Sequence, residues 1–283
     1  AESKTIRAYL DSPWIYANGK ITDGYWTFGA SGPADAIVIG GLASGCANYN
    51  TIDFSKPVWC GEDLGTFVTM DQLSCYQKSA NGYVKEVIFA DSITNILNSA
   101  FHNCTALETV RLPANLEYIA DAAFHQASSL KTVTPLFPKK TVVSSAAFTG
   151  CTKLEGDLVI WTKRQTKILT HATASLGVFT QTAISSADFS RTAITEMGVY
   201  CFYQCPNLGD VSLPKTVTLM RSATLHGCNS LSNIVFRSFP KDGFGGDVFG
   251  ANNKYGQFGR RLVYPRGDPD WQAYMDFAAR KGW

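Results

Sequence analysis

Short bursts of alternating apolar and polar residues run along the middle of this 283-residue chain. In the stretch ETVRLP, residues 108–113, Val110 and Leu112 fall on one side of an extended backbone. Thr109 and Arg111 fall on the other side. Pro113 then ends the strand, because proline cannot donate a hydrogen bond to a neighbouring strand. The pattern predicts a short strand with one buried face.

The same pattern returns at a fixed interval. Residues 84–107 and 107–130 align at their apolar positions without a gap, which sets a period of about 23 residues. Further copies begin at Leu130 and Leu208, and an overlong, degenerate copy runs over 154–184. One such unit cannot bury its apolar face alone, so neighbouring units must stack. The repeats therefore predict a parallel-stranded solenoid with a continuous core.

The repeat resembles a known family. Residues 107–130, LETVRLPANLEYIADAAFHQASSL, and residues 208–231, LGDVSLPKTVTLMRSATLHGCNSL, share a pattern that resembles the BspA-like leucine-rich repeats. The C-terminal RLVYPRGDPDWQAYMDFAARKGW is also similar to the end of such proteins, where a last strand and a short aromatic helix close the stack. We expect a right-handed leucine-rich-repeat solenoid of the α/β class, mostly short parallel strands with irregular or short helical connections.

The chain is expected to divide into two regions. Residues 1–83 form an N-terminal, β-rich cap region in which a degenerate repeat can begin as early as Ala36, and residues 84–283 form the solenoid with a C-terminal helical cap at 262–283. The aromatic segment 12–29 favours a hairpin whose rings plug the first repeat, with stacking on sugar rings as the alternative.

Four cysteines recur once per repeat. Cys104, Cys151, Cys205 and Cys228 each stand three residues after a phenylalanine or leucine, where the second copy has Ala127. A position that accepts Cys or Ala selects a small apolar side chain, so we interpret these thiols as core fillers. Zinc needs four converging ligands at short paired spacings, which this pattern does not supply. Stacking would bring Cys205 and Cys228 about 5 Å apart, so a disulfide stays open there. It also stays open for the three N-terminal cysteines, Cys46, Cys60 and Cys75.

Three of the four histidines share one offset as well. His102, His125 and His226 follow directly after that phenylalanine or leucine, at the start of the predicted outer turn. We expect surface positions, with His102 and His125 stacked as neighbours. A two-histidine metal contact is the alternative, although no carboxylate or third ligand stands at a matching offset. No metal site and no cofactor are expected.

The composition and the motifs of the chain argue against several classes of function. Charged residues make up 17% of the chain and the formal net charge is +2, which gives no electrostatic basis for binding nucleic acid. No apolar run approaches the roughly eighteen residues of a membrane span. The serine in GGLASGC, residues 40–46, lacks the GxSxG spacing of a nucleophile elbow, and we expect no catalysis.

The tripeptide Arg266-Gly267-Asp268 matches an integrin-recognition motif. A structural role is favoured, because Asp268 can cap a helix that begins at Pro269. Four side chains of that helix would then pack on the end of the solenoid: Trp271, Tyr274, Phe277 and Ala278.

Binding is expected on the outward side of the strands, through mixed and mostly uncharged side chains that suit a broad surface better than a deep pocket. The candidate residues are Glu86, Ile88, Thr109, Arg111, Thr132, Thr134, Asp210 and Ser212.

The family resemblance implies a bacterial protein, secreted or at the outer cell surface, that binds a protein or glycan. A lipid anchor on a segment outside this sequence is one way to hold it there. We expect a monomer. The alternatives are a structural spacer in a larger surface assembly, or a parallel-β polysaccharide-active enzyme, which would need charged groups clustered on adjacent turns.

Overall fold

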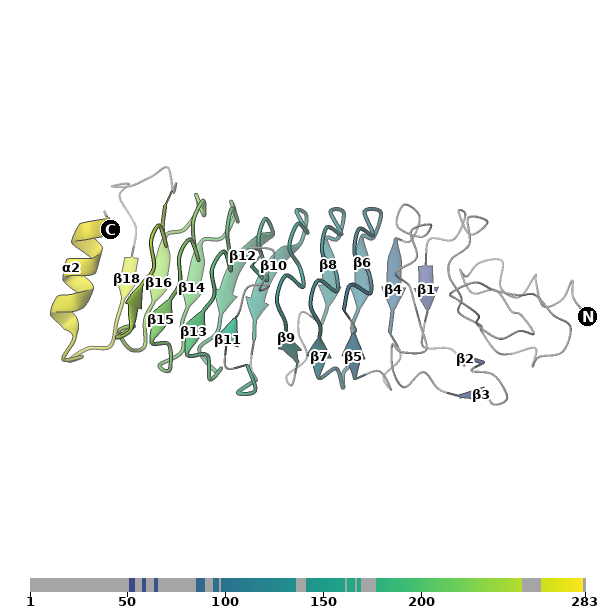
Figure 1. Cartoon of the computed structure of the whole chain (residues 1–283), viewed down its shortest axis with the longest axis horizontal. Coiled ribbons are helices and arrows are strands. Elements are labelled where there is room, and N and C mark those ends of the chain that lie inside the picture. Colours follow the sequence, from purple (N-terminus) through teal and green to yellow (C-terminus); the bar gives the residue numbers. More distant parts are fainter. Residues whose placement is uncertain are drawn as a thin grey trace, which may run out of the picture.

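The computed structural model of the chain is a solenoid whose turns stack along one long axis (Figure 1). It describes residues 51–53, 58–59, 64–65, 85–89, 94–96, 98–135, 141–160, 162–165, 167–168, 177–250 and 261–281. Most of the expected N-terminal cap region lies outside these residues, as do the aromatic segment 12–29, Cys46, Cys60, Cys75 and the fourth histidine of the chain, His171.

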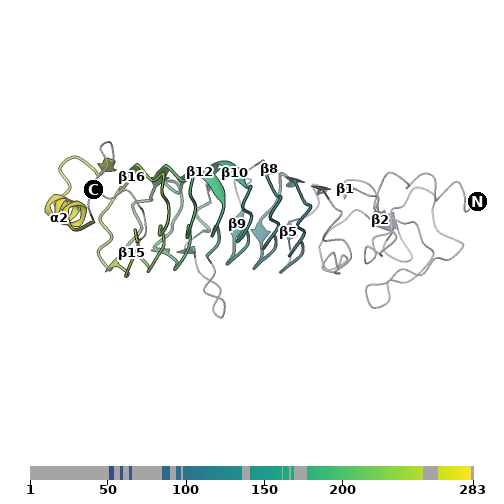
Figure 2. The ribbon, with the colours of Figure 1, turned by 90° about the horizontal axis from the view of Figure 1, so that it is seen from above.

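One side of the solenoid is a ladder of parallel strands, seen edge-on in Figure 2, whose outward surface we call the strand face. Its first block orders β1 (Thr51–Asp53), β4 (Glu86–Ile88), β6 (Thr109–Arg111) and β8 (Thr132–Thr134). Its second block orders β10 (Glu155–Val159), β12 (Ala183–Asp188), β14 (Asp210–Ser212), β16 (Asn233–Val235) and β18 (Arg261–Val263).

A second side carries shorter parallel strands, which we call the second sheet. The first block is β5 (Asn95–Ile96), β7 (Tyr118–Ile119) and β9 (Val142–Val143). The second block is β11 (Lys167–Ile168), β13 (Glu196–Met197), β15 (Leu219–Met220) and β17 (Gly243–Phe244). Outside the solenoid ladders, β2 (Val58–Trp59) pairs antiparallel with β3 (Leu64–Gly65). The predicted parallel-stranded solenoid is confirmed.

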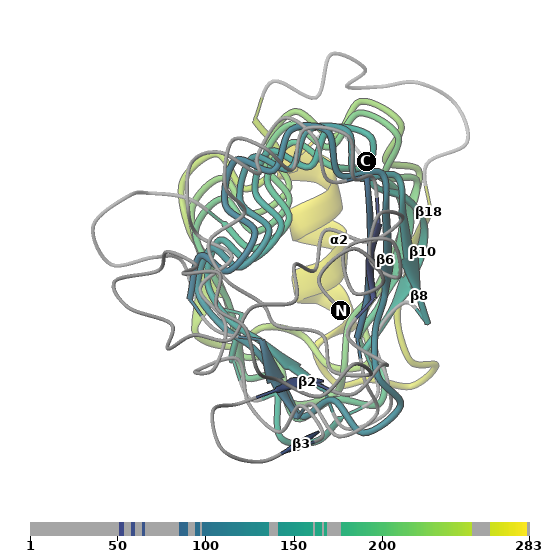
Figure 3. The same ribbon diagram turned by 90° about the vertical axis from the view of Figure 1, so that its right-hand side faces the viewer.

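The third side consists of tight turns, which close each coil between the end of the second sheet and the next long strand (Figure 3). We call its outer surface the turn face; it covers residues 98–106, 121–129, 145–153, 177–182, 199–207 and 222–230. Neighbouring turns are joined by backbone hydrogen bonds, such as Phe101 N–H to Ala123 O at 2.7 Å and Asn103 N–H to His125 O at 2.8 Å. This side is therefore as regular as the sheets.

A column of phenylalanine rings fills the core behind the turn face. Consecutive rings stack with centroids 5.2–5.9 Å apart and planes within 13° of parallel, each side chain being at most 1% exposed. The column comprises Phe101, Phe124, Phe148, Phe179 and Phe202. Phe179 belongs to the overlong copy, so the column of rings continues through that copy.

Both ladders are interrupted at the overlong copy, between β8 and β10 and between β9 and β11. Gln165 lies buried at this break, and its carboxamide takes the place of a strand backbone. Its Oε1 accepts from Val143 N–H at 2.8 Å, and its Nε2 donates to Val143 O at 3.2 Å. One side chain thus satisfies the open edge of β9, where an unpaired buried polar group would be costly.

The helix α2 (Trp271–Lys281) covers the C-terminal end of the stack. Tyr274 and Phe277 are buried against the last turns, as the sequence predicted. Asp268 accepts from Asp270 N–H at 2.9 Å and from Tyr274 Oη at 3.2 Å, so its carboxylate holds the turn that leads into the helix and, contrary to the sequence prediction, does not cap the helix itself. The helix begins two residues later than Pro269, at Trp271.

The expected packing of Trp271 is wrong, because this side chain is 53% exposed. The helical rotation of about 100° per residue places Trp271 roughly 90° around the helix from the midpoint between Tyr274 and Phe277. It therefore lies beside the buried stripe, on the same side as the exposed Met275.

We expect Gln165→Leu to lower the free energy of unfolding by about 2–4 kcal/mol, because it leaves the buried N–H and C=O of Val143 without their side-chain partner. Chemical denaturation followed by circular dichroism measures this. The control is Gln181→Leu, since Gln181 lies exposed on the turn face. Equal stabilities for the two variants would show that the hydrogen bonds from the carboxamide of Gln165 do not stabilise the edge of β9.

Candidate binding face

The eight predicted site residues all lie on the strand face, with half-buried or exposed side chains, while the central valines of the same strands are buried. The register aligns Glu86 with Thr109 and Thr109 with Thr132. It aligns Ile88, Arg111 and Thr134 in the adjoining column. The structure therefore brings six of the eight together as two parallel columns.

Asp210 and Ser212 belong to the second block, beyond the break in the ladder. They stand in register with Asn233 and Val235 of the next turn. The structure thus keeps these two apart from the six residues of the first block. The role of all eight in binding stays a prediction.

Ion pairs link successive turns of the first block. Arg111 Nε lies 3.2 Å from Glu86 Oε1, across the two columns of candidate residues. The residues immediately before β4, β6 and β8 alternate in sign, and Lys85 pairs with Glu108 at 3.7 Å. Lys131 pairs across the break with Glu155, the first residue of β10, at 3.5 Å. Most of these side chains are more than half exposed, so each pair adds little stability. Their main effect is a face with balanced charge.

These alternating charges were missed at the sequence level, although a signal was present. Lys85, Glu108 and Lys131 stand at the same offset in consecutive copies. Comparing this one position across the aligned copies would have shown that its charge alternates in sign from one copy to the next.

The second block is polar in a different way, because its carboxylates bond to hydroxyl and amide groups. Asp157 Oδ1 accepts from Ser185 Oγ at 3.0 Å and from Ser186 Oγ at 2.7 Å. A register shift at Gly156 and Asp157 brings both serines opposite one carboxylate. Irregularity in the overlong copy hid this cluster from sequence analysis.

Asn233 Nδ2 donates to Asp210 Oδ1 at 2.5 Å, so this candidate carboxylate is also held by a neighbouring turn. The strand face as a whole thus changes from ion pairs in its first block to a hydroxyl, amide and carboxylate surface in its second.

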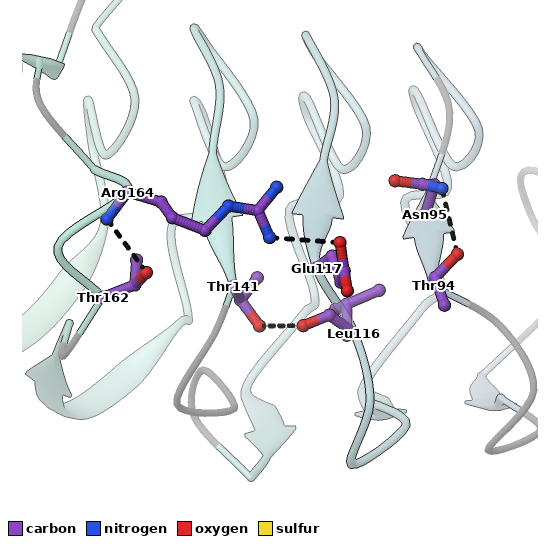
Figure 4. A network of polar contacts seen from close by, with 7 residues as sticks. All are labelled: Thr94, Asn95, Leu116, Glu117, Thr141, Thr162 and Arg164. Carbon is purple, nitrogen blue, oxygen red and sulfur yellow. Dashed lines mark hydrogen bonds and ion pairs between the residues drawn. The ribbon is translucent and has the colours of Figure 1, made fainter.

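Figure 4 shows a polar network on the second sheet that crosses the break. Arg164 Nη1 donates to Glu117 Oε2 at 3.1 Å, which ties the overlong copy to β7. Thr141 Oγ1 donates to Leu116 O at 2.9 Å. The threonine contact joins adjacent turns and the ion pair spans two turns, so we assign both a structural role.

The repeated cysteines are buried, as the core-filler interpretation predicted. Three of the thiols also donate to the phenylalanine carbonyl of the preceding turn: Cys151 to Phe124 at 3.1 Å, Cys205 to Phe179 at 3.0 Å and Cys228 to Phe202 at 3.0 Å. The five described cysteines, which include Cys201, are free thiols, so Cys205 and Cys228 are not joined in this structure. Burial raises the pKa of Cys104 to about 12 and raises the pKa of Cys151 further.

We expect the native protein to resist alkylation at these five positions at pH 7–8, because all five side chains are buried and out of reach of the reagent. At Cys104 and Cys151 burial also disfavours the thiolate, which is the reactive form. Iodoacetamide treatment before and after unfolding, read by peptide mass spectrometry, tests this. Rapid labelling of Cys104 in the folded protein would contradict the buried placement of its thiol.

The rings of His102 and His125 lie with centroids 4.7 Å apart on the turn face, which confirms the predicted stacking. His226 departs from that pair, because it stacks on Tyr203 at 5.0 Å. All three are half-buried. Across the described ranges, no group of three or more His, Cys, Asp or Glu side chains is placed to hold a metal ion. Nor does any helix in these ranges have the length and apolar character needed to cross a bilayer.

A family model for the BspA type leucine-rich repeat region matches residues 73–173 and 170–254, in six copies. Among proteins with curated descriptions, none matches the chain.

Three solved structures resemble it at low identity. A leucine-rich repeat protein of T. pallidum is 20% identical with a TM-score of 0.46, over 59% of this chain and 75% of that one. A leucine-rich cell surface protein of Faecalibacterium prausnitzii is 14% identical with a TM-score of 0.38, over 84% and 93%. The pneumococcal vaccine antigen PcpA is 14% identical with a TM-score of 0.32, over 79% and 76%.

Proposed function

The chain belongs to the BspA type leucine-rich repeat family, and we propose that it is a secreted or cell-surface bacterial binding module that engages a protein or glycan through its strand face. It acts as a monomer and carries out no catalysis. Retention at the surface would come from an anchor outside this sequence, such as a lipid.

The observation that carries this proposal is the in-register alignment of outward side chains along both blocks of the ladder. Each turn places the equivalent residue about 4.8 Å from that of its neighbour, on a backbone held by hydrogen bonds. Such a surface is extended and already ordered, so the protein loses little conformational entropy when a large ligand docks on it.

The charge distribution favours a ligand without high charge. Ion pairs balance the first block, where Arg111 pairs with Glu86. The candidate threonines Thr109, Thr132 and Thr134 lie among these pairs and offer hydroxyl groups and methyl groups. A neutral glycan or a mixed protein surface has matching chemistry.

The absence of catalysis is supported by the family, which is typically non-catalytic. Adjacent turns of the second block place Ser186 between Asp157 and Asp210 in the register, so two carboxylates do not follow one another there. The relative from Faecalibacterium prausnitzii is described as a cell surface protein, which supports the proposed location.

A screen of glycan arrays and purified matrix proteins, with hits measured by biolayer interferometry, tests the proposal. We expect Thr132→Glu combined with Thr134→Glu to weaken binding of a hit at least tenfold, because two carboxylates then stand in the exposed columns of the first block. Arg111 is left unchanged, since reversing it would also replace its ion pair with Glu86 by two adjacent carboxylates.

The matched control is Gln126→Glu combined with Gln181→Glu, which adds the same charge to exposed positions of the turn face. This control should bind within about twofold of the unmodified protein. Equal binding by the strand-face variant would move the site elsewhere, and a screen without any hit would favour a structural spacer.

A further inference from the structure

The turn face repeats one outward position directly after each core phenylalanine or leucine. Half-buried side chains occupy it at His102, His125, Tyr203 and His226, whereas Thr149 and Thr180 fill it with buried hydroxyl side chains. The first two are imidazoles on consecutive turns, with centroids 4.7 Å apart and planes inclined by 36°. We propose that His102 and His125 together bind one divalent transition-metal ion, Cu²⁺ or Ni²⁺, with the remaining coordination positions filled by water or by an external ligand.

The separation of the two rings fits shared coordination. With metal–nitrogen bonds of about 2.0–2.1 Å, two imidazoles bound at about 90–100° around one ion have ring centroids roughly 4.5–5 Å apart. The observed 4.7 Å lies within that range. The spacing of the rings thus matches two imidazoles that share one ion.

The backbone holds this pair in place before any ion arrives. Asn103 N–H donates to His125 O at 2.8 Å, directly between the two turns. His102 N–H bonds to Ser99 O at 3.1 Å, and His125 N–H bonds to Ala122 O at 3.0 Å. A pair of ligands fixed by such contacts loses little entropy when it chelates an ion.

Neutral imidazole is the form that binds metal. Each neutral ring has two nitrogens, so one can ligate while the other keeps an N–H donor for a neighbouring group.

The ligand set selects the kind of ion. Two imidazoles suit Cu²⁺, Ni²⁺ or Zn²⁺, whereas Ca²⁺ and Mg²⁺ prefer oxygen ligands. A right-angle arrangement of nitrogens matches the tetragonal preference of Cu²⁺ and Ni²⁺ better than the tetrahedral preference of Zn²⁺. No third His, Cys, Asp or Glu of the described residues converges on the pair, so ligands from outside the chain, such as water, would complete the coordination shell.

His226 provides a matched control, because it has the same offset and a different neighbour. Its ring stacks on Tyr203 with planes 24° apart. Its Nδ1 is buried without a hydrogen-bond partner among the described residues. A Cβ built on Gly250 would come within 2.7 Å of this atom, so the chain of the next turn closes over it. We expect no metal binding at His226.

Isothermal titration of the full chain with NiCl₂ tests the proposal. The unmodified protein should bind an ion that the variants His102→Gln and His125→Gln each bind at least tenfold more weakly, whereas His226→Gln should match the unmodified protein within about twofold. The double variant His102→Gln/His125→Gln measures binding by other groups of the chain. Unchanged affinity in either single variant, or a comparable loss in His226→Gln, would overturn the shared site.

A second measurement needs no substitution. Diethyl pyrocarbonate modifies neutral imidazole nitrogens, and peptide mass spectrometry reads each histidine separately. Ni²⁺ should protect His102 and His125 and leave the modification of His226 unchanged. Absence of protection at the pair would overturn the proposal even if a variant failed to fold.

Discussion

The structure depends on contact between turns one period apart. Backbone hydrogen bonds join neighbouring coils on all three sides, and the phenylalanine column stacks behind the turn face. A single coil has no partner for its apolar side, so each turn is stable only against the next. Since the contact repeats in register, any side chain that points outward lines up with its equivalents. The strand face and the histidine pair are both consequences of that alignment.

Because each turn is stable only against its neighbour, the ends of the ladder and the break within it need other groups to satisfy their exposed backbone and apolar side chains. At the overlong copy the sheets stop, and Gln165 supplies from a side chain the hydrogen bonds that a strand would have given to Val143. At the C-terminal end, α2 covers the last turns with Tyr274 and Phe277. Asp268 holds the turn that leads into this helix, which gives the aspartate of the Arg-Gly-Asp tripeptide a structural role.

The regular parts of the solenoid could be predicted, because the repeat period and the alternation of apolar and polar residues determine them directly. The buried valines of the strands, the phenylalanine column and the small cysteine position all follow from aligning one copy on the next.

Gln165 could not be predicted, since a polar residue in a degenerate copy gives no sign of which backbone it will meet. The prediction that Trp271 is packed was wrong, because its burial depends on where α2 begins and how the helix is rotated. The apolar character of the side chain alone does not determine either. The Asp157 cluster needed a register shift that no repeat pattern contains. The candidate strand face was placed correctly as a surface, while its division into two blocks appeared only with the break.

The register of the strand face is the central claim, and engineered disulfides test it most directly. In the pair Thr109→Cys and Thr132→Cys the two residues are Cα partners on neighbouring strands, about 4.8 Å apart and within disulfide range. In the pair Thr109→Cys and Thr134→Cys they are offset by two residues, about 8 Å apart and beyond that range. Mild oxidation followed by mass spectrometry of unreduced peptides should find the bridge in the first variant and not in the second. A bridge in the second variant, or none in the first, would contradict the account.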